Sequence, residues 1–403
     1  MEKKILATKV RSLATVGDFL TLLNQMKRED QGVEEDPHPF TLKHINYYRN
    51  PSHEGRYRSF KIPKKSGGCR VISAPRNKTF RLILRYVNEM LKALYTPSEY
   101  AMGFAEGRSV VTNAQIHLRQ NYVFNTDLKD FFPSVDQARV WARLQIKPLS
   151  LQRPIAGIIA GLCSVRLETD EGTVRYVLPQ GAPTSPILTN MVCDTLDRRL
   201  GGVAKRFGLH YSRYADDITF SSMHNVYEEG GDFRSELRRV VEDQRFVINE
   251  KKTRLQKRGT RQEVTGLIVG ERLNVPQSYV RGIRNLLYIW RKHGEGEARA
   301  RFEETYMAEK GHLREKCPDM ILVLEGKLCY LRMVKGPNDS VYRRLSADFE
   351  RLLHTDEGAV EPLPSGGEQL LAEGLALTAS APVDLEALNL DLDQLLNNGW
   401  DTK

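Results

Sequence analysis

The sequence predicts a mixed fold of helices and strands, and three kinds of stretch carry that prediction. Residues 56–75 alternate in polarity and contain KIPKKSGGCRVISAP, which is typical of a β-hairpin that turns at its Ser-Gly-Gly sequence. Residues 209–222, LHYSRYADDITFSS, indicate two short strands around a tight acidic turn. Residues 79–95 and 277–293 place apolar side chains at helical spacing, so we expect a helix in each.

The composition is that of a globular protein with a real core. A length of 403 residues predicts two or three domains, and the hydrophobic and charged fractions of 40% and 28% are ordinary for soluble proteins. The five cysteines are scattered without metal-site or redox-motif spacing, and their odd number fits a reducing compartment. Lys9, Arg11 and Asp18 interrupt any apolar run near the N-terminus. We therefore expect a cytoplasmic protein without a signal peptide or membrane contact.

The charge is distributed unevenly along the chain. The formal net charge is +9 and the isoelectric point is about 9.2. Residues 355–403 contain ten acidic residues and one basic residue, so residues 1–354 carry a net charge of +18. A basic surface attracts polyanions, of which nucleic acid is the commonest large one, although a merely soluble basic protein is the alternative.

The acidic tail begins with a linker and ends in a leucine-rich segment. Pro362, Pro364 and the Gly366-Gly367 pair are typical of a linker. The final VDLEALNLDLDQLLNNGW predicts either a short helix that docks on a partner or on the basic body, or a weakly ordered solvated tail.

Three carboxylates are the candidate chemical centre. Asp216 and Asp217 are adjacent between apolar strand residues, where like charges repel and a divalent cation removes the conflict. Asp127 ends another apolar segment, YVFNTD. Two strands that bring these three side chains together would hold two metal ions, which activate an attacking 3′-oxygen and steady a leaving pyrophosphate. An exposed Asp-Asp turn is the alternative for the pair alone.

A loop of unusual composition precedes the acidic turn. Residues 178–190, LPQGAPTSPILTN, contain a glycine and two prolines that predict an irregular loop opening a helix between Thr184 and Pro186. Such a helix start offers free backbone N–H groups, together with the Gln180 side chain, to a substrate. A plain loop-to-helix junction would give the same pattern.

The order of these motifs resembles that of the reverse-transcriptase family across roughly residues 50–275. The chain presents GGCRVISAP, the Asp127 strand, LPQGAPTSP, YADD, INEKKT and VTG in the family's order and spacing. The resemblance implies an α+β, right-hand polymerase fold with fingers, palm and thumb. Its expected parts are an N-terminal helical segment at 1–45, fingers at 46–120, palm at 121–135 and 178–271, a fingers insertion at 136–177, a basic helical thumb at 272–354 and the acidic tail at 355–403.

The resemblance also implies roles for the catalytic residues. Asp127, Asp216 and Asp217 match the metal-binding carboxylates, and the backbone carbonyl of Leu128 completes the shell of two Mg²⁺ ions, with Mn²⁺ as a substitute. Phe132 matches the aromatic gate under the sugar, which clashes with a ribose 2′-OH and favours deoxynucleoside triphosphates.

Other positions match residues that handle the incoming nucleotide. Gln180 and Gly181 match its contact loop. Lys65 and Arg70 match the fingers residues that hold the triphosphate, and Lys252 matches a lysine near the pyrophosphate that acts as a proton donor. Lys64 in place of Lys65, and Lys251 in place of Lys252, remain open.

Two short motifs resemble those of the retron subfamily. Asn113-Ala114 followed by His117, and the run Val264-Thr265-Gly266, stand where retron reverse transcriptases carry their signatures. This implies an enzyme that copies a cognate structured non-coding RNA from the 2′-OH of a guanosine, so that the DNA product is branched from the RNA. A core histidine at 117 and a strand bulge at Thr265-Gly266 are the structural alternatives.

The resemblance further implies partners. Structured RNA is read by shape and unpaired bases, so the basic thumb helix is a candidate RNA contact through Arg281, Arg284, Arg291 and Lys292. A solvated charged face of an amphipathic helix is the alternative. Retrons are also linked to defence against phage through an effector protein, for which the acidic tail is our candidate contact.

Three other functions compete with this interpretation. A group II intron-type reverse transcriptase usually carries a maturase region, and no such length remains here. An RNA-binding scaffold with a vestigial polymerase site is disfavoured by the intact Asp127, Asp216, Asp217 and Gln180. An RNA-templated RNA polymerase is disfavoured by Phe132.

Overall fold

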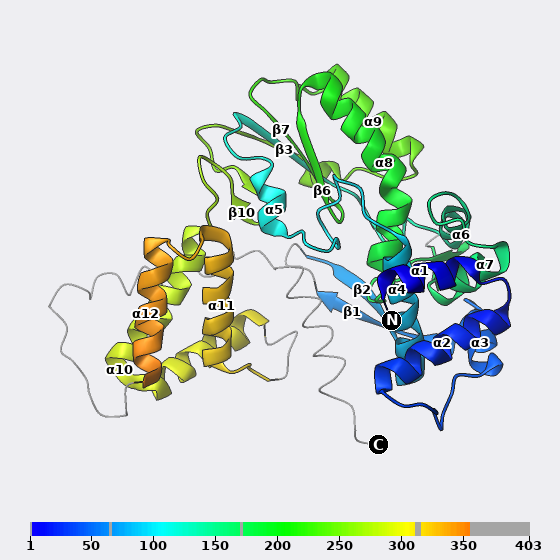
Figure 1. Cartoon of the computed structure of the whole chain (residues 1–403). Helices are drawn as coiled ribbons and strands as arrows, with labels where there is room; N and C mark the ends of the chain where they lie inside the picture. Colours follow the sequence, from blue (N-terminus) through cyan, green and yellow to red (C-terminus); the bar gives the residue numbers. More distant parts are fainter. Residues whose placement is uncertain (1, 64–66, 170–171, 311–315, 355–403) are drawn as a thin grey trace. The chain divides into compact units, whose positions relative to one another are not determined.

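The computed structural model describes residues 2–63, 67–169, 172–310 and 316–354, and the chain divides into two compact units (Figure 1). The first unit comprises Met1–Ser109 and Asn121–Leu255, and the second comprises Val110–Gln120 and Gln256–Lys403. Helices and strands alternate along the chain, which confirms the predicted α+β class. The division places residues 110–120 with the C-terminal unit, whereas the sequence analysis groups them with the fingers.

The N-terminal part of the first unit is helical, as predicted. Helices α1 (Lys3–Ser12), α2 (Val16–Gln31) and α3 (Leu42–Tyr48) precede the hairpin, and α4 (Lys78–Leu94) follows it. The Thr15 side chain caps α2 in a capping box. The apolar stripe of α4 is buried at Phe80, Ile83, Leu84, Val87, Met90 and Leu91. This stripe packs the helices into one core.

The predicted hairpin is present. Strand β1 (Tyr57–Pro63) pairs antiparallel with β2 (Cys69–Pro75), and Pro63 stands opposite Cys69. Gly67 and Gly68 have φ values of 83° and 78°, which explains the glycines at this turn. Residues 64–66 lie outside the described part of the chain.

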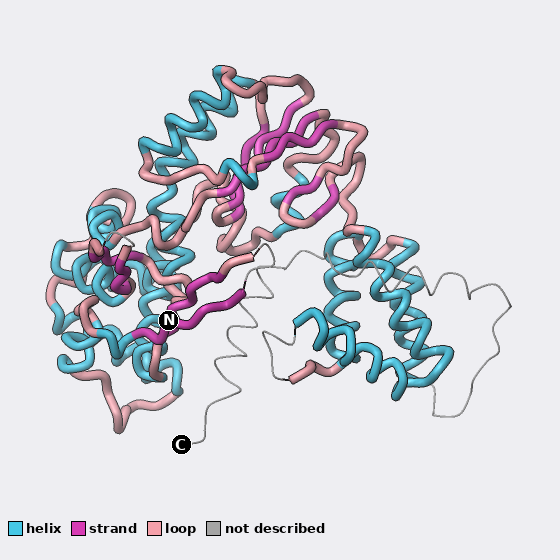
Figure 2. The backbone as a smooth tube through the Cα atoms, turned by 180° about the vertical axis from the view of Figure 1, so that it is seen from behind, coloured by secondary structure: helices cyan, strands magenta, loops and turns pink. Residues whose placement is uncertain are grey.

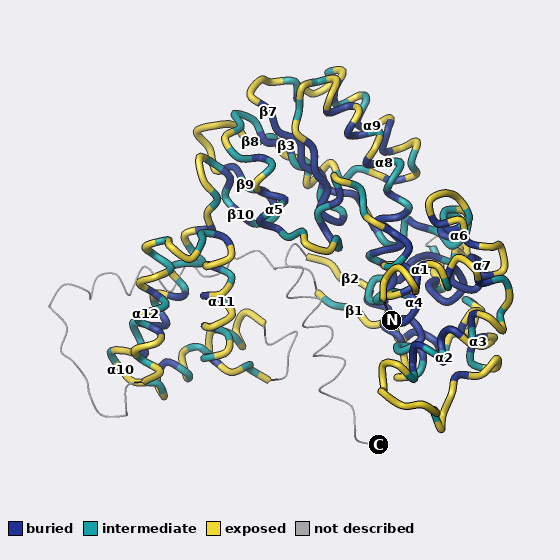
Figure 3. Tube along the Cα trace, in the orientation of Figure 1, coloured by how far each residue is buried: buried dark blue, intermediate teal, exposed yellow. Residues whose placement is uncertain are grey.

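The central element of the first unit is a four-stranded sheet in the order β6-β7-β3-β8 (Figure 2). Its strands are β3 (Tyr122–Asp127), β6 (His210–Tyr214), β7 (Asp217–Ser222) and β8 (Arg254–Lys257). The strands β3, β6 and β7 are almost entirely buried (Figure 3). Helices α8 (Ser185–Phe207) and α9 (Asp232–Asp243) run beside each other along this sheet (Figure 1).

A smaller helical layer lies between β3 and α8 in sequence. It contains α6 (Gln137–Gln145), α7 (Arg153–Leu162) and the hairpin of β4 (Val165–Glu168) with β5 (Val174–Val177). The N-cap of α6 is Asp136, whose side chain accepts a hydrogen bond from the Arg139 N–H. The Ser134 hydroxyl, two residues before this cap, donates to the Phe131 carbonyl.

The second unit combines a short segment from the middle of the chain with the C-terminal helices. Helix α5 (Val110–Gln115) packs against the small hairpin of β9 (Glu263–Val264) and β10 (Leu267–Ile268). Helix α10 (Gln277–Lys310) begins where predicted and is kinked at Gly294, and α11 (Met320–Lys335) and α12 (Ser340–His354) pack on it. The tail at 355–403 lies outside the described residues. None of the helices that the structure describes has the length and apolarity needed to cross a membrane.

Candidate active site

The three predicted carboxylates meet at one end of the central sheet. Asp127 is the last residue of β3 and stands directly opposite Asp217, the first residue of β7. Tyr214 pairs with Asp217, so Ala215 and Asp216 form the two-residue loop between β6 and β7. The Leu128 N–H donates to the Asp216 carbonyl at 3.1 Å, which fixes this loop against the end of β3. Residues that lie some ninety positions apart in sequence therefore form one acidic site.

Asp127 is held by the segment that follows α9. Lys252 Nζ donates to Asp127 Oδ1 at 2.7 Å, and Asn249 Nδ2 donates to Asp127 Oδ2 at 3.1 Å. The Asn249 N–H also donates to the Asp127 backbone carbonyl. Of the two lysines left open by the sequence, Lys252 is the one that contacts a catalytic carboxylate. Asn249 was missed, although it belongs to the INEKKT motif.

Asp216 and Asp217 have raised pKa values. Burial raises the pKa of Asp216 to about 6, with a contribution from the Asp127 charge, while Lys252 and Arg70 oppose the shift. Burial raises the pKa of Asp217 to about 7, with contributions from Asp216 and Asp127. Their charges are therefore incompletely compensated by protein groups.

The donor chemistry fits a hard divalent cation. The site offers carboxylate oxygens, which are ligands that Mg²⁺ prefers. The backbone carbonyl of Leu128, the residue after Asp127, stays a predicted further ligand. In the conformation described, no three carboxylate, His or Cys side chains of residues 2–63, 67–169, 172–310 and 316–354 converge as a metal cluster. Both Asp127 oxygens are instead engaged by Lys252 and Asn249.

A buried ion pair supports the loop that carries Asp216. Arg213 and Asp197 are completely buried and form two charge-assisted bonds of 2.7 Å. Arg213 Nη1 also donates to the Ala215 carbonyl at 3.0 Å. Ala215 has a φ of 55°, which is uncommon for a residue with a side chain. The arginine thus links α8 to the strained loop that carries Asp216, a predicted catalytic carboxylate.

Gly103 allows the chain to approach this loop closely. A Cβ at Gly103 would lie 2.6 Å from the Ala215 nitrogen. The Gly103 carbonyl accepts a bond from Asn190 Nδ2 at 3.0 Å, and Met102 N–H donates to the Arg213 carbonyl. Met102 and Gly103, which precede α5, therefore pack against the turn that carries Asp216. This contact was not predicted from the sequence.

The LPQG loop is joined to the hairpin. The Ser73 N–H on β2 donates to the Gln180 carbonyl at 2.8 Å. Gly181 has a φ of 122°, and a Cβ there would lie 2.9 Å from the Ile72 side chain. The helix after the loop, α8, begins at Ser185 as predicted. Glycine at 181 is thus required by both backbone conformation and packing.

The remaining predicted nucleotide contacts are placed around these elements. Arg70 lies on β2, and its charge opposes the rise in the pKa of Asp216. Phe132 is half-buried, with its ring centroid 5.5 Å from that of Phe131 and 6.2 Å from that of Phe104. Lys65 and Lys64 lie outside the described residues.

The two retron-like motifs come together in the second unit. Asn113 Nδ2 donates to Thr265 Oγ1 at 3.3 Å. Thr265 and Gly266 occupy the loop between β9 and β10 and have φ values of 46° and 79°. Asn113, His117 and Val264 are all buried. Their burial favours a role in shaping this unit. The RNA contact that the resemblance implies for Asn113, His117, Val264, Thr265 and Gly266 stays a prediction.

Replacing Gly266 by Ala is expected to destabilise the second unit by about 1–2 kcal/mol, because a side chain in the left-handed region is strained. Chemical denaturation of the full chain would measure the change. Gly282 on α10 is a matched control, because a Cβ there meets open space and alanine favours a helix. Equal stability of Gly266→Ala and wild type would contradict the proposed geometry of the loop.

The basic face of α10 is as predicted. Ile283, Leu286, Leu287 and Trp290 are buried, whereas Arg281, Arg284 and Arg291 are exposed. At about 100° per residue, these arginines, Tyr288 and Lys292 lie on one stripe of the helix. The Lys292 ammonium lies 5.8 Å from the centre of the Tyr288 ring. The stripe has the charge and the aromatic group that a nucleic-acid contact needs.

Comparison with known proteins identifies the family. The family described as "Reverse transcriptase (RNA-dependent DNA polymerase)" matches residues 62–269, which is more than half of the chain. The chain is 35% identical over 302 residues to the retron Mx65 reverse transcriptase of Myxococcus xanthus, covering 73% of this chain and 65% of that protein. It is 34% identical to the retron Mx162 reverse transcriptase of the same organism, covering 63% and 57%. It is 33% identical to the retron Ec86 reverse transcriptase of Escherichia coli, covering 54% and 64%.

These matches span less than two thirds of each relative's own length. The family match over residues 62–269 includes β2, the three carboxylates and the LPQG loop. The predicted resemblance to retron enzymes is confirmed, and the chain belongs to the reverse-transcriptase family.

Proposed function

We propose that this chain is the RNA-directed DNA polymerase of a retron. The observation that carries the proposal is the cross-strand pairing of Asp127 with Asp217, with Asp216 in the adjoining loop. The link between the LPQG loop and the hairpin supports it, because both motifs belong to nucleotide handling in the family.

The residues of the site have distinct tasks in nucleotidyl transfer. Asp127, Asp216 and Asp217, with the Leu128 carbonyl, would hold Mg²⁺, which when bound stabilises the charge on the attacking and leaving oxygens. Arg70 offers a planar guanidinium to the triphosphate. Lys252, whose pKa is raised by its bond to Asp127 against the opposing effect of burial, holds a proton that it can give to the leaving pyrophosphate.

A primed RNA template with deoxynucleotides tests the activity directly. We expect Mg²⁺-dependent extension, with Mn²⁺ as a substitute. Failure to extend any primed RNA would favour the alternative of an RNA-binding scaffold with a vestigial site. Extension that requires a group II intron RNA would instead favour a group II intron-type enzyme.

Replacing Phe132 by Ala is expected to raise ribonucleotide relative to deoxynucleotide incorporation by about tenfold or more, because the ring no longer meets the 2′-OH. The measurement is single-nucleotide extension with each kind of triphosphate. Phe302→Ala, in the other unit, controls for the loss of an aromatic ring. An unchanged ratio would remove Phe132 from sugar selection.

The retron assignment extends the proposal to the template and the product. The chain would copy its cognate structured non-coding RNA from a 2′-OH in that RNA, giving single-stranded DNA branched from the RNA, in the cytoplasm. The hydrogen bond between Asn113 and Thr265 supports it, because it joins the two retron-like motifs. The exposed stripe of Arg281, Arg284 and Arg291 is the proposed RNA contact.

An effector protein of an anti-phage system is the proposed further partner. The acidic tail at 355–403 is the proposed contact, on the ground of its charge and leucine content. Deleting residues 362–403 is expected to abolish co-purification of the effector while leaving primer extension intact. Unchanged effector binding and phage resistance would contradict this role of the tail.

A further inference from the structure

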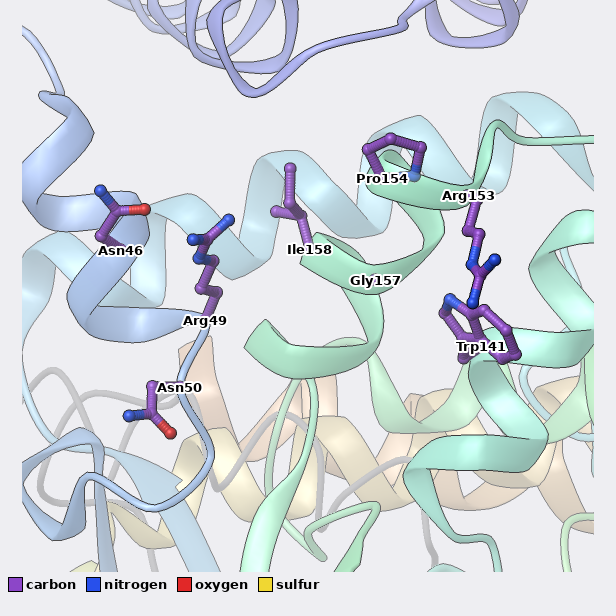
Figure 4. Close-up of a pocket in the computed structure, with 8 residues that line it drawn as sticks. All are labelled: Asn46, Arg49, Asn50, Trp141, Arg153, Pro154, Gly157 and Ile158. Atoms are coloured by element: carbon purple, nitrogen blue, oxygen red, sulfur yellow. The ribbon is translucent and has the colours of Figure 1, made fainter.

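A cavity on the first unit has the lining of a nucleotide site and contains none of the predicted catalytic residues. It has a volume of about 730 Å³, within the range of ligand sites, and lies where the end of α3 faces α6 and α7. Its lining consists of Asn46, Arg49, Asn50, Trp141, Arg153, Pro154, Gly157 and Ile158 (Figure 4).

The charge of the lining favours an anion. Arg49 and Arg153 are exposed, and neither forms an ion pair with any acidic residue in the described part of the chain. Other arginines of this unit, such as Arg143 with Asp194, are neutralised by a carboxylate. Pro154 stands in the first turn of α7, which has no side-chain cap, so the positive end of the helix adds to the two guanidinium groups.

The cavity also offers a stacking surface. Trp141 is half-buried, and the Arg153 guanidinium carbon lies 5.4 Å from the centre of its ring, as Figure 4 shows. Gly157 lies beside the indole, and a Cβ there would be 3.9 Å from Trp141 Nε1, which is an ordinary van der Waals distance. Asn46 supplies an amide of the kind that reads base edges, and Asn50, whose Oδ1 accepts from the Ser52 N–H, supplies an amide donor.

The ends of α3 and α7, which form two walls of the cavity, are held together by contacts below its lining. Buried Arg56 donates to the Tyr48 carbonyl at the end of α3 and to the Gly161 carbonyl at the end of α7. A Cβ at Gly161 would lie 2.2 Å from the Arg49 carbonyl, so the two helices touch through backbone. The cavity is therefore formed before any ligand arrives, which lowers the entropic cost of binding.

We propose that this cavity binds a segment of single-stranded nucleic acid, with backbone phosphates at Arg49 and at Arg153 and a base against Trp141. Base stacking on an aromatic ring beside arginines that bind phosphate is the common basis of single-strand recognition. The inference rests on the proposed function only in that such an enzyme handles both an RNA and a DNA strand. It adds a second strand contact, whose lining includes none of the three proposed catalytic carboxylates.

Site-specific photocrosslinking tests the proposal independently of polymerase activity. The probes are 12-nucleotide single strands, one an RNA containing 4-thiouridine and the other a DNA containing 4-thiothymidine. Each is irradiated with the full chain in the presence of excess unlabelled primer–template. We expect crosslinks on the peptides that contain Trp141 or residues 153–158. Labelling by the RNA probe alone, or by the DNA probe alone, identifies the strand that is bound.

Substitutions in the lining of the cavity distinguish specific binding there from general attraction of nucleic acid to a basic surface. The double variant Arg49→Glu with Arg153→Glu is expected to weaken these crosslinks by about tenfold or more. Arg198→Glu, an exposed arginine on α8, is expected to change them less than about twofold. Gly157→Leu is expected to block the cavity, whereas Gly157→Ala is expected to leave binding intact and favour the helix.

Crosslinks found only elsewhere, or an equal loss with Arg198→Glu, would overturn the proposal. Primer extension on a short duplex is measured for each variant, and we expect it to be unchanged. A chain that fails to extend primers but still crosslinks at Trp141 would contradict the proposed polymerase activity. The same result would still support the proposed binding of single-stranded nucleic acid in the cavity.

Discussion

Replacing Asp216 or Asp217 by Asn is expected to reduce deoxynucleotide incorporation by about 10³-fold or more, which corresponds to roughly 4 kcal/mol of lost transition-state stabilisation. The reason is geometric, because Asp217 faces Asp127 across two strands and Asp216 lies in the adjoining loop. Single-turnover extension of a primed RNA template at saturating Mg²⁺ measures the effect.

The same variants carry a second readout that does not depend on activity. Without metal, they are expected to unfold at a higher temperature than wild type, because one of the repelling carboxylates is gone. Added Mg²⁺ is expected to raise the melting temperature of wild type and not of the variants. Asp243→Asn, which removes a carboxylate from a surface ion pair with Arg199, is the control. Full activity in Asp216→Asn would contradict the assignment of the site.

The second large effect is expected at Arg213. Replacing it by Met leaves the completely buried Asp197 without its partner, and the expected loss in the free energy of unfolding is about 3–5 kcal/mol. The Ala215 carbonyl also loses its donor, so the loop that carries Asp216 is released. We therefore expect both stability and polymerase activity to fall.

A double variant separates these two consequences. In Arg213→Met with Asp197→Asn, no charge is left unpaired, and Asn still provides an acceptor for the Tyr211 hydroxyl. Most of the lost stability is expected to return, while activity stays reduced by about tenfold or more and the Mg²⁺ concentration for half-maximal activity rises. Recovery of wild-type activity and Mg²⁺ dependence in the double variant would limit Arg213 to a structural role.

Much of the fold was predictable because local signals agreed with the final structure. The Gly-rich hairpin, the apolar stripe of α4 and the two strands around YADD all lie where their sequence patterns predict. The helix after LPQG begins at Ser185, within the predicted window. These elements carry their own turn chemistry and periodicity, so they need no information from distant parts of the chain.

The parts that could not be predicted depend on contacts between distant residues. Arg213 stands in a strand that alternates ordinarily, and nothing local distinguishes it from an exposed arginine. Its burial follows from Asp197 on α8 and from the segment at Gly103. Asn249 is missed for the same reason, because its role appears only when the segment after α9 meets Asp127.

The retron-like motifs were located from the sequence, but their contacts with each other were not predicted. Their positions were identified from resemblance, but the 3.3 Å bond between Asn113 and Thr265 is a tertiary contact that joins residues 152 positions apart. The burial of His117 likewise depends on how α5 packs. Resemblance thus located the residues, and the structure explains why two short motifs occur together.

The most direct test of the central claim is to purify the chain from cells that carry its native locus and to analyse the bound nucleic acid. Denaturing gels would be run with and without RNase and DNase. We predict a discrete species that shifts after RNase and disappears after DNase, as expected of DNA joined to RNA. A chain that brings down only RNA, or no nucleic acid, while still extending a primed RNA template would be a reverse transcriptase of another kind, and the retron assignment would be wrong.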